Sequence, residues 1–226
     1  YNHRESVRRA ATYGLIAVGG DAPDTLIEAT NSPAKWVRKA GVYGLGDASP
    51  LTDEVYQAVS TRLAVDPSVY IRSVAAGSLG CLGRRAVATS QGTSLIPDCM
   101  ASLIQSLGRE VIRLCMSRAQ GRSIKFVRPT DECDVCEGNG VDFGLERFGP
   151  VRYAVRVNVL WSMVILCTHG ADVLGAQLQP TINVLRDVIR TDRNVICVGY
   201  AMDALARLVN LQPNGAEESS GLSLIH

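Results

Sequence analysis

Two cysteines separated by two residues form the motif with the most specific chemical content in this chain of 226 residues. Cys133 and Cys136 are followed by Gly138 and Gly140, and these glycines allow the tight turn that brings two thiolates onto one zinc ion. The same pair would alternatively form a reversible disulfide, or remain as two exposed cysteines without a cofactor. We favour the last interpretation, because one pair of cysteines is half of a zinc site.

The spacing resembles a single Cys-x-x-Cys-x-Gly-x-Gly unit from the zinc region of J-domain co-chaperones. That family uses several copies of the unit, so that each zinc ion receives four sulfur ligands, whereas this chain has one copy. A closed tetrahedral site would therefore need two further ligands from elsewhere. They would come from a second chain, or from Cys115, Cys167 or His169 if the segment folds back.

A cluster of six basic residues precedes the cysteine pair. Its members are Arg109, Arg113, Arg118, Arg122, Lys125 and Arg128. Such a cluster would suit an acidic protein surface or a nucleic-acid backbone. We favour a solvated helix face instead, because a run of acidic residues follows the cluster and would neutralise it.

The chain offers few other groups for catalysis. Its three histidines, His3, His169 and His226, lie far apart in the sequence, and no Ser-His-Asp set or nucleophile elbow can be assembled around them. The glycines that follow Cys136 lack the strand and helix that a phosphate-binding loop requires. The sequence therefore predicts a protein that is not an enzyme.

Any site must be positioned by a helical segment that recurs along the chain. Residues 7–15 recur at 37–45 and again at 71–79, each with an aliphatic residue, a basic residue next to it, a small residue four positions on and Leu eight positions on. A weaker copy begins at Val155, and the segment from Cys197 to Leu205 fits the frame only loosely. These spacings place the apolar residues on one helical stripe, which a single hairpin cannot bury. The repeat therefore predicts stacked helical hairpins.

The predicted fold class is all-α, an α-solenoid of stacked helical hairpins with one long insertion loop. We expect repeats at residues 1–120, an irregular insertion at 121–149, further helices at 150–211 and a flexible tail at 212–226. Capping signals place the ends of individual helices. Gly19 and Gly20 end one, Ser32-Pro33 and Ser49-Pro50 start two more, and Asp66-Pro67 starts another.

Two further expectations concern breaks in the helices. Residues 94–107 and 109–120 read as two separate helices. Pro180 is expected to kink or split the helix that begins at Asp172, because proline lacks a backbone donor. Trp36 and Trp161 lie in or next to the repeat frame and are expected in the core.

The three leading copies resemble HEAT repeats, in particular the short variety first described in phycobilin lyases. Asp66-Pro67, Ile71-Arg72, Ala75-Ala76 and Leu79-Gly80 match that motif best. The resemblance implies that the recurrent arginines form a structural ladder, each pairing with an acidic or carbonyl group of an adjacent repeat. We expect this of Arg8, Arg38, Arg72 and Arg156. The alternative is that these arginines form a basic stripe that binds phosphate groups or an acidic partner.

Composition narrows the class of partner. With 23 basic and 22 acidic residues the formal net charge is +1, which provides no global field for nucleic acid, and no apolar run is long enough for a membrane span. The seven cysteines are mostly set in apolar helical surroundings, which favours a reducing compartment inside the cell, either the cytoplasm or the interior of an organelle.

The predicted function is that of a noncatalytic scaffold for protein–protein interaction, or of an assembly subunit that stabilises a larger complex. No cofactor is expected, apart from the zinc alternative at Cys133 and Cys136. The resemblance to phycobilin lyases adds a second hypothesis, an enzyme or chaperone that acts on a chromophore-binding protein.

Overall fold

The computed structural model describes residues 3–20, 22–89, 92–119 and 154–209, and every regular element in these ranges is a helix. The expected all-α class is therefore confirmed for the described chain. The expected insertion at 121–149 and the expected tail at 212–226 lie outside the described residues.

The helices follow one another as pairs along the chain. In order they are α1 (His3–Val18), α2 (Ala22–Thr30), α3 (Lys35–Asp47), α4 (Asp53–Val65), α5 (Val69–Ala86), α6 (Gly92–Ala119), α7 (Ala154–His169), the short 3-10 turns η4 (Ala171–Val173) and η5 (Gly175–Gln177), α8 (Leu178–Thr191) and α9 (Val195–Val209).

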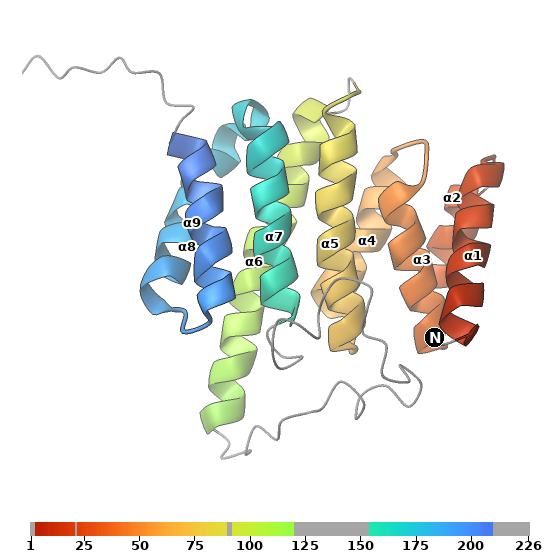
Figure 1. Ribbon diagram of the computed structural model, residues 1–226, viewed down its shortest axis with the longest axis horizontal. Coiled ribbons are helices and arrows are strands. Elements are labelled where there is room, and N and C mark those ends of the chain that lie inside the picture. The colour runs from red at the N-terminus through yellow and green to blue at the C-terminus, as the bar shows by residue number, and fades with distance from the viewer. Residues whose placement is uncertain (1–2, 21, 90–91, 120–153, 210–226) are drawn as a thin grey trace, which may run out of the picture.

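The described helices lie in two layers (Figure 1). The odd-numbered helices contact one another in chain order, from α1 to α9, and form one layer. The even-numbered helices also contact one another in order, from α2 to α8, and lie behind the first layer. Each odd-numbered helix starts at the lower edge of the view in Figure 1, so that the amino ends of this layer share one edge of the molecule.

The core runs between the two layers, and the repeat frame locates it. The residues eight positions after the aliphatic start of the second, third and fourth copies, Leu45, Leu79 and Met163, are fully buried. The aliphatic residues that start the copies differ in their exposure to solvent. Ile71 and Val155 are fully buried, whereas Val7 and Val37 are 54% and 43% exposed. The expectation of one buried apolar stripe is therefore wrong at the start of the first two copies.

Close contact between neighbouring helices depends on small residues. A Cβ atom added at Gly41 of α3 would lie 2.7 Å from the carbonyl oxygen of Leu26 and 2.9 Å from the amide nitrogen of Thr30, both in the backbone. Only glycine lets α2 and α3 approach this closely. The carboxyl end of α3 is held by α5, since Nη1 of Arg85 donates to the carbonyl oxygen of Ala48 at 2.7 Å.

Helix starts and stops agree with the sequence in part. Gly19 and Gly20 end α1 with φ angles of 69° and 62°, as their residue type predicts. The expected start of a helix at Ser49-Pro50 is wrong. α4 begins at Asp53, and its cap is Thr52, whose hydroxyl accepts from the backbone N–H of Val55 at 3.3 Å. A hydroxyl in the cap position satisfies an amide that has no partner within the helix.

Two breaks expected from proline and from periodicity turn out differently. Residues 94–107 and 109–120 do not form two helices, because α6 runs unbroken from Gly92 to Ala119 with Pro97 inside it. The helix expected from Asp172 is split, as Pro180 suggested. The break precedes Pro180, which lies in the first turn of α8, where its missing donor costs nothing.

Trp36 and Trp161, expected in the core, are half-buried.

Candidate functional site

The recurrent arginines form a ladder of buried ion pairs with acidic residues of a following loop or helix. In the second copy, Nε of Arg38 lies 2.9 Å from Oδ2 of Asp66, which precedes α5, and the Asp66 side chain is fully buried. Nη1 of Arg38 also donates to the carbonyl oxygens of Ser32 and Pro33, each at 3.0 Å. The guanidinium thus binds the loop before its own helix to the loop of the next hairpin.

The third copy repeats this arrangement with a different acid. Nη1 of Arg72 donates to the carbonyl oxygens of Asp66 and Pro67 at 2.9 and 3.2 Å, as Arg38 does to its own preceding loop. Nε of Arg72 lies 3.0 Å from Oε1 of Glu110, which belongs to α6. Both side chains are only 7% exposed, so neither charge is left without a partner in the interior.

The fourth copy forms its pair between Arg156 and Asp192, which lies in the loop before α9. Both side chains are 7% exposed. The expected pairing with an adjacent repeat is therefore confirmed for Arg38 and Arg156. Arg72 pairs instead with an acid of α6, the second helix of its own hairpin. The three guanidinium groups are used in these buried pairs, which argues against a basic stripe that binds phosphate groups or an acidic partner. The side chain of Arg8 lies outside the described part of the structure.

A second set of contacts recurs at the same positions of the frame. Oγ of Ser78 in α5 donates to the carbonyl oxygen of Val42 in α3 at 2.9 Å. One repeat later, Oγ of Ser162 in α7 donates to the carbonyl oxygen of Ala76 in α5 at 2.8 Å. Both serines are seven residues after the start of their copy, and both acceptors are five residues after theirs. Two successive interfaces in the odd-numbered layer therefore share one geometry.

An open groove of about 380 Å³ lies between α2 and α4, in the even-numbered layer. Its lining includes Ile27 and Asn31 on one side and Asp53, Glu54 and Gln57 on the other. Hydrogen bonds from its own backbone N–H and from the Thr52 hydroxyl lower the pKa of Glu54, so its carboxylate is charged at neutral pH. The lining thus combines two carboxylates and two amide groups with the side chains of Thr30, Thr61 and Arg62.

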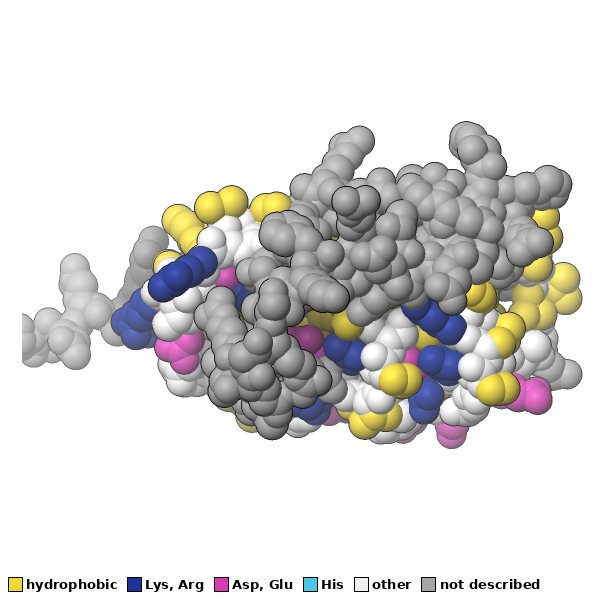
Figure 2. Space-filling model, turned by 90° about the horizontal axis from the view of Figure 1, so that it is seen from below, with side chains coloured by type: hydrophobic (Ala, Val, Ile, Leu, Met, Phe, Trp, Pro, Cys, Tyr) yellow, Lys and Arg dark blue, Asp and Glu magenta, His cyan; other side chains and the backbone are white. Residues whose placement is uncertain are grey.

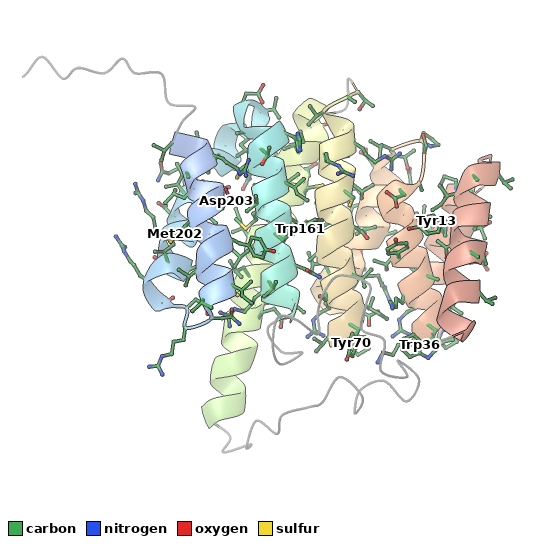
Figure 3. The ribbon with its side chains drawn as sticks, in the orientation of Figure 1. Tyr13, Trp36, Tyr70, Trp161, Met202 and Asp203 are labelled. Atoms are coloured by element: carbon green, nitrogen blue, oxygen red, sulfur yellow. The ribbon has the colours of Figure 1, made fainter. Side chains whose placement is uncertain are left out.

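The lower edge of the odd-numbered layer combines basic and aromatic residues. Nζ of Lys35 lies 5.0 Å from the ring centre of Tyr70 and 5.4 Å from that of Trp36, within the range of a cation–π contact. Trp36 and Tyr70 occupy equivalent positions, each just before the aliphatic start of its copy, and both lie at this edge (Figure 3). Seen from below, both basic and acidic side chains lie on this face among hydrophobic ones (Figure 2).

The described thiols are poor nucleophiles. Burial raises the pKa of the Cys99 thiol far above its ordinary value and raises that of Cys167 to about 12. Burial also raises the pKa values of Cys81 and Cys197. Because the thiolate is the reactive form, these four cysteines act as small apolar residues at neutral pH.

The candidate residues from the sequence are placed only in part. Arg109 is half-buried on α6. Arg113 and Arg118 also belong to α6, but their side chains lie outside the described part. Arg122, Lys125, Arg128, Cys133 and Cys136 lie outside the described residues altogether. Among the residues that are described, no three His, Cys, Asp or Glu side chains come together in a way that could hold a metal ion.

The acids of the ladder are the residues that sequence reasoning did not assign. The sequence marks Asp66 only as a helix start, and it gives no signal for Glu110 or Asp192. The signal in the sequence is weak, because the three acids lie at different distances from their arginines. Asp66 and Asp192 do share one local feature, since each accepts through Oδ1 from the backbone N–H two residues later, at 2.9 Å.

Comparison with known proteins does not identify a family for this chain. No family model, no curated protein and no solved structure matches the chain. In the part of the chain that the structure describes, no helix combines the length and the apolar character that crossing a bilayer requires.

Proposed function

We propose that this chain is an α-solenoid of HEAT-like hairpins and that it acts as a noncatalytic scaffold for protein–protein interaction. The observation that supports the proposal is the recurrence of one contact geometry at successive interfaces. Ser78 bonds to Val42 and Ser162 bonds to Ala76 in the same register, and the ladder pairs accompany them. Repeated units that contact only their neighbours form an extended surface, which is typical of binding proteins.

The side-chain chemistry of the described residues agrees with a scaffold. The buried charged groups, such as Arg38, Asp66 and Arg72, join helices and loops that follow one another in the chain. The α2–α4 groove, with Asp53 and Glu54, and the lower edge, with Lys35 beside Trp36 and Tyr70, provide two surfaces with charged groups. Surfaces of this kind select a partner by electrostatic complementarity.

The test is recovery of the full chain with its partner from its native source. We expect one defined protein to co-purify in constant ratio. If the groove is the contact surface, Asp53→Lys together with Glu54→Lys should reduce the recovery. Asp187→Lys is the matched control, because it reverses an exposed carboxylate of the same layer on α8. A chain that is recovered alone, under conditions that preserve other complexes, would contradict the proposal.

The bilin-lyase-like alternative has the resemblance as its sole support. It predicts a covalent coloured adduct when the chain, a bilin and an acceptor protein are incubated together. Absence of such an adduct with every chromophore-binding acceptor would remove it.

A further inference from the structure

The groove between α2 and α4 has opposite charges at its two ends. Asp53 and Glu54 line it in the first turn of α4, and Arg62 lines it in the last turn of the same helix. Eight residues separate Glu54 from Arg62, so at 1.5 Å per residue the acidic and basic ends are about 12 Å apart. The groove therefore has an electrical direction as well as a shape.

The acidic end of the groove is open to solvent. Asp53 and Glu54 are both exposed, and in the described part of the chain neither carboxylate forms an ion pair. The hydrogen bonds that lower the pKa of Glu54 keep this carboxylate charged at neutral pH. A cation brought by a ligand would meet two carboxylates at this end.

The basic end has more positive charge than its own acid neutralises. Nε of Arg38 lies 2.9 Å from Oδ2 of Asp66, whereas Nη1 of Arg62 lies 3.9 Å from the same oxygen. Nε of Arg62 is buried and has no hydrogen-bond partner among the described residues. Two guanidinium groups thus share one carboxylate, and Arg62 is the more weakly paired of the two. A carboxylate from a ligand would supply the missing counter-charge.

The middle of the groove is suited to a peptide chain. Ile27 and Ala58 are half-buried apolar residues in its lining, and the amide side chains of Asn31 and Gln57 lie on opposite walls. An extended peptide has backbone N–H and C=O groups that need partners, and amide side chains can provide them. A helix already satisfies these groups internally and would leave the two amides unused. The chemistry of the lining therefore favours an extended ligand.

The spacing along α4 also matches an extended chain. The lining residues of α4 come in three pairs, one in each successive turn: Asp53 and Glu54, Gln57 and Ala58, Thr61 and Arg62. Successive pairs are about 6 Å apart along the helix axis. Alternate side chains of an extended peptide point to the same side and are about 6.6 Å apart. The first, third and fifth residues of an extended segment thus match the three turns.

We infer that the α2–α4 groove binds an extended five-residue segment of a partner protein, with a basic side chain at one end, an apolar side chain in the middle and an acidic side chain at the other end. The basic side chain pairs with Asp53 and Glu54, the apolar one contacts Ile27, and the acidic one pairs with Arg62. Both chain directions satisfy these contacts, so the charges and not the direction define the segment. This inference rests on the proposed scaffold function, since it names the chemistry of the partner.

The chain's own residues 210–226 do not have this chemistry. They include two glutamates but no Lys or Arg, so they offer nothing that would pair with the acidic end of the groove. The occupant is therefore sought in a second protein.

The test titrates short peptides into the full chain and follows backbone amide signals by NMR. The probes are Lys-Ala-Val-Ala-Glu and its reverse Glu-Ala-Val-Ala-Lys, both with blocked ends so that terminal charges are absent. We expect at least one of them to shift the amides of residues 27–31 and 53–62 saturably, with an affinity that falls as salt is added. Two reference peptides, with Lys at both ends or Glu at both ends, should bind about fivefold more weakly or worse, because each puts one like charge into the groove.

Variants of the chain test each end separately. Asp53→Asn together with Glu54→Gln should weaken binding by about two- to fivefold and remove the preference for Lys at that end. Arg62→Gln should remove the preference for Glu over Gln at the other end. Because Arg62 also contacts Asp66, a probe with Gln in place of its Glu tests this end without a change in the fold. Asp187→Asn, which neutralises an exposed carboxylate on α8, is the matched control and should change nothing. Circular dichroism checks that the helices are retained.

Several results would overturn the inference. They are equal affinity for all four peptides, shifts confined to residues outside the groove, a probe that binds as a helix, and equal weakening by Asp187→Asn. A chain that co-purifies with a defined partner but binds neither probe leaves the scaffold role intact and refutes this groove chemistry. A chain that binds a probe but is recovered alone from its source supports the groove chemistry and contradicts the scaffold role.

Discussion

The strongest test of the ladder is removal of the carboxylate of Asp66. That side chain is fully buried and accepts from Nε and Nη2 of Arg38 at 2.9 and 3.3 Å and from the backbone N–H of Ser68 at 2.9 Å. Asp66→Ala removes all three acceptor contacts at once and leaves a guanidinium that is 12% exposed without its counter-charge.

The expected loss of stability follows from these contacts. Removing one partner of a buried ion pair costs about 3–5 kcal/mol. Arg38 keeps the carbonyl oxygens of Ser32 and Pro33 and touches solvent, so the ion-pair part should lie near the lower limit. The lost bond to Ser68 adds about 1 kcal/mol. We expect Asp66→Ala to lower the free energy of unfolding by about 3–4 kcal/mol, and Asp66→Asn by less, because the amide oxygen still accepts from Ser68.

Asp203→Ala provides the matched control for this experiment. Oδ1 of Asp203 lies 3.1 Å from Nε of Arg207, but these side chains are 46% and 38% exposed. An exposed pair four residues apart on a helix contributes about 0.3–0.5 kcal/mol. Urea unfolding followed by circular dichroism measures both variants. If Asp66→Ala costs no more than Asp203→Ala, burial does not strengthen the ladder and the reasoning above is refuted.

Three further predictions follow from close packing, from thiol burial and from the cysteine pair. Gly41→Ala should destabilise the chain by about 1–3 kcal/mol, because the added Cβ atom would lie 2.7 Å from a backbone oxygen of α2. Gly108→Ala is the control, since its Cβ atom would meet no atom of the described neighbouring residues within 4 Å. It should stabilise α6 by up to about 1 kcal/mol in the same urea assay. A folded pKa of about 12 means that the Cys167 thiol binds its proton more tightly when folded, so stability should fall by about 1.4 kcal/mol per pH unit above the unfolded pKa of about 8.5. The stability of Cys167→Ala should fall less steeply with pH, and an unchanged slope would exclude this cause. Metal analysis of the purified chain should find no stoichiometric zinc, and zinc that disappears in Cys133→Ser would establish the alternative.

The repeat frame allowed the helices and much of the core to be predicted, because period and residue size are local properties. Leu45, Leu79 and Met163 occupy one position and are all fully buried. In the loose copy from Cys197, Ala201 four positions on is fully buried, whereas Leu205 eight positions on is half-buried. Periodicity could not distinguish copies with an exposed start residue from copies with a buried one, since Val37 is exposed although α3 lies between α1 and α5.

The partners of the ladder could not be predicted, because they depend on which loops meet after the hairpins pack. Asp66 is in a short turn before α5, while Glu110 lies well inside a helix whose unbroken length the sequence did not indicate. Close packing at Gly41 was hidden for the same reason, since any small residue fits the repeat motif there. The residues considered for zinc and for the basic cluster lie mostly outside the described part and stay predictions.

The variation among the ladder acids indicates what the array requires. Asp66 and Asp192 come from loops and Glu110 comes from a helix, yet each neutralises an arginine at the same frame position. What recurs is therefore a counter-charge for a buried guanidinium near the amino ends of helices, where the helix dipoles are also positive. A copy with arginine at this position depends on an acid from a loop or helix that follows it in the chain. α9 has Val198 at this position, so it places no guanidinium there that would need such a counter-charge.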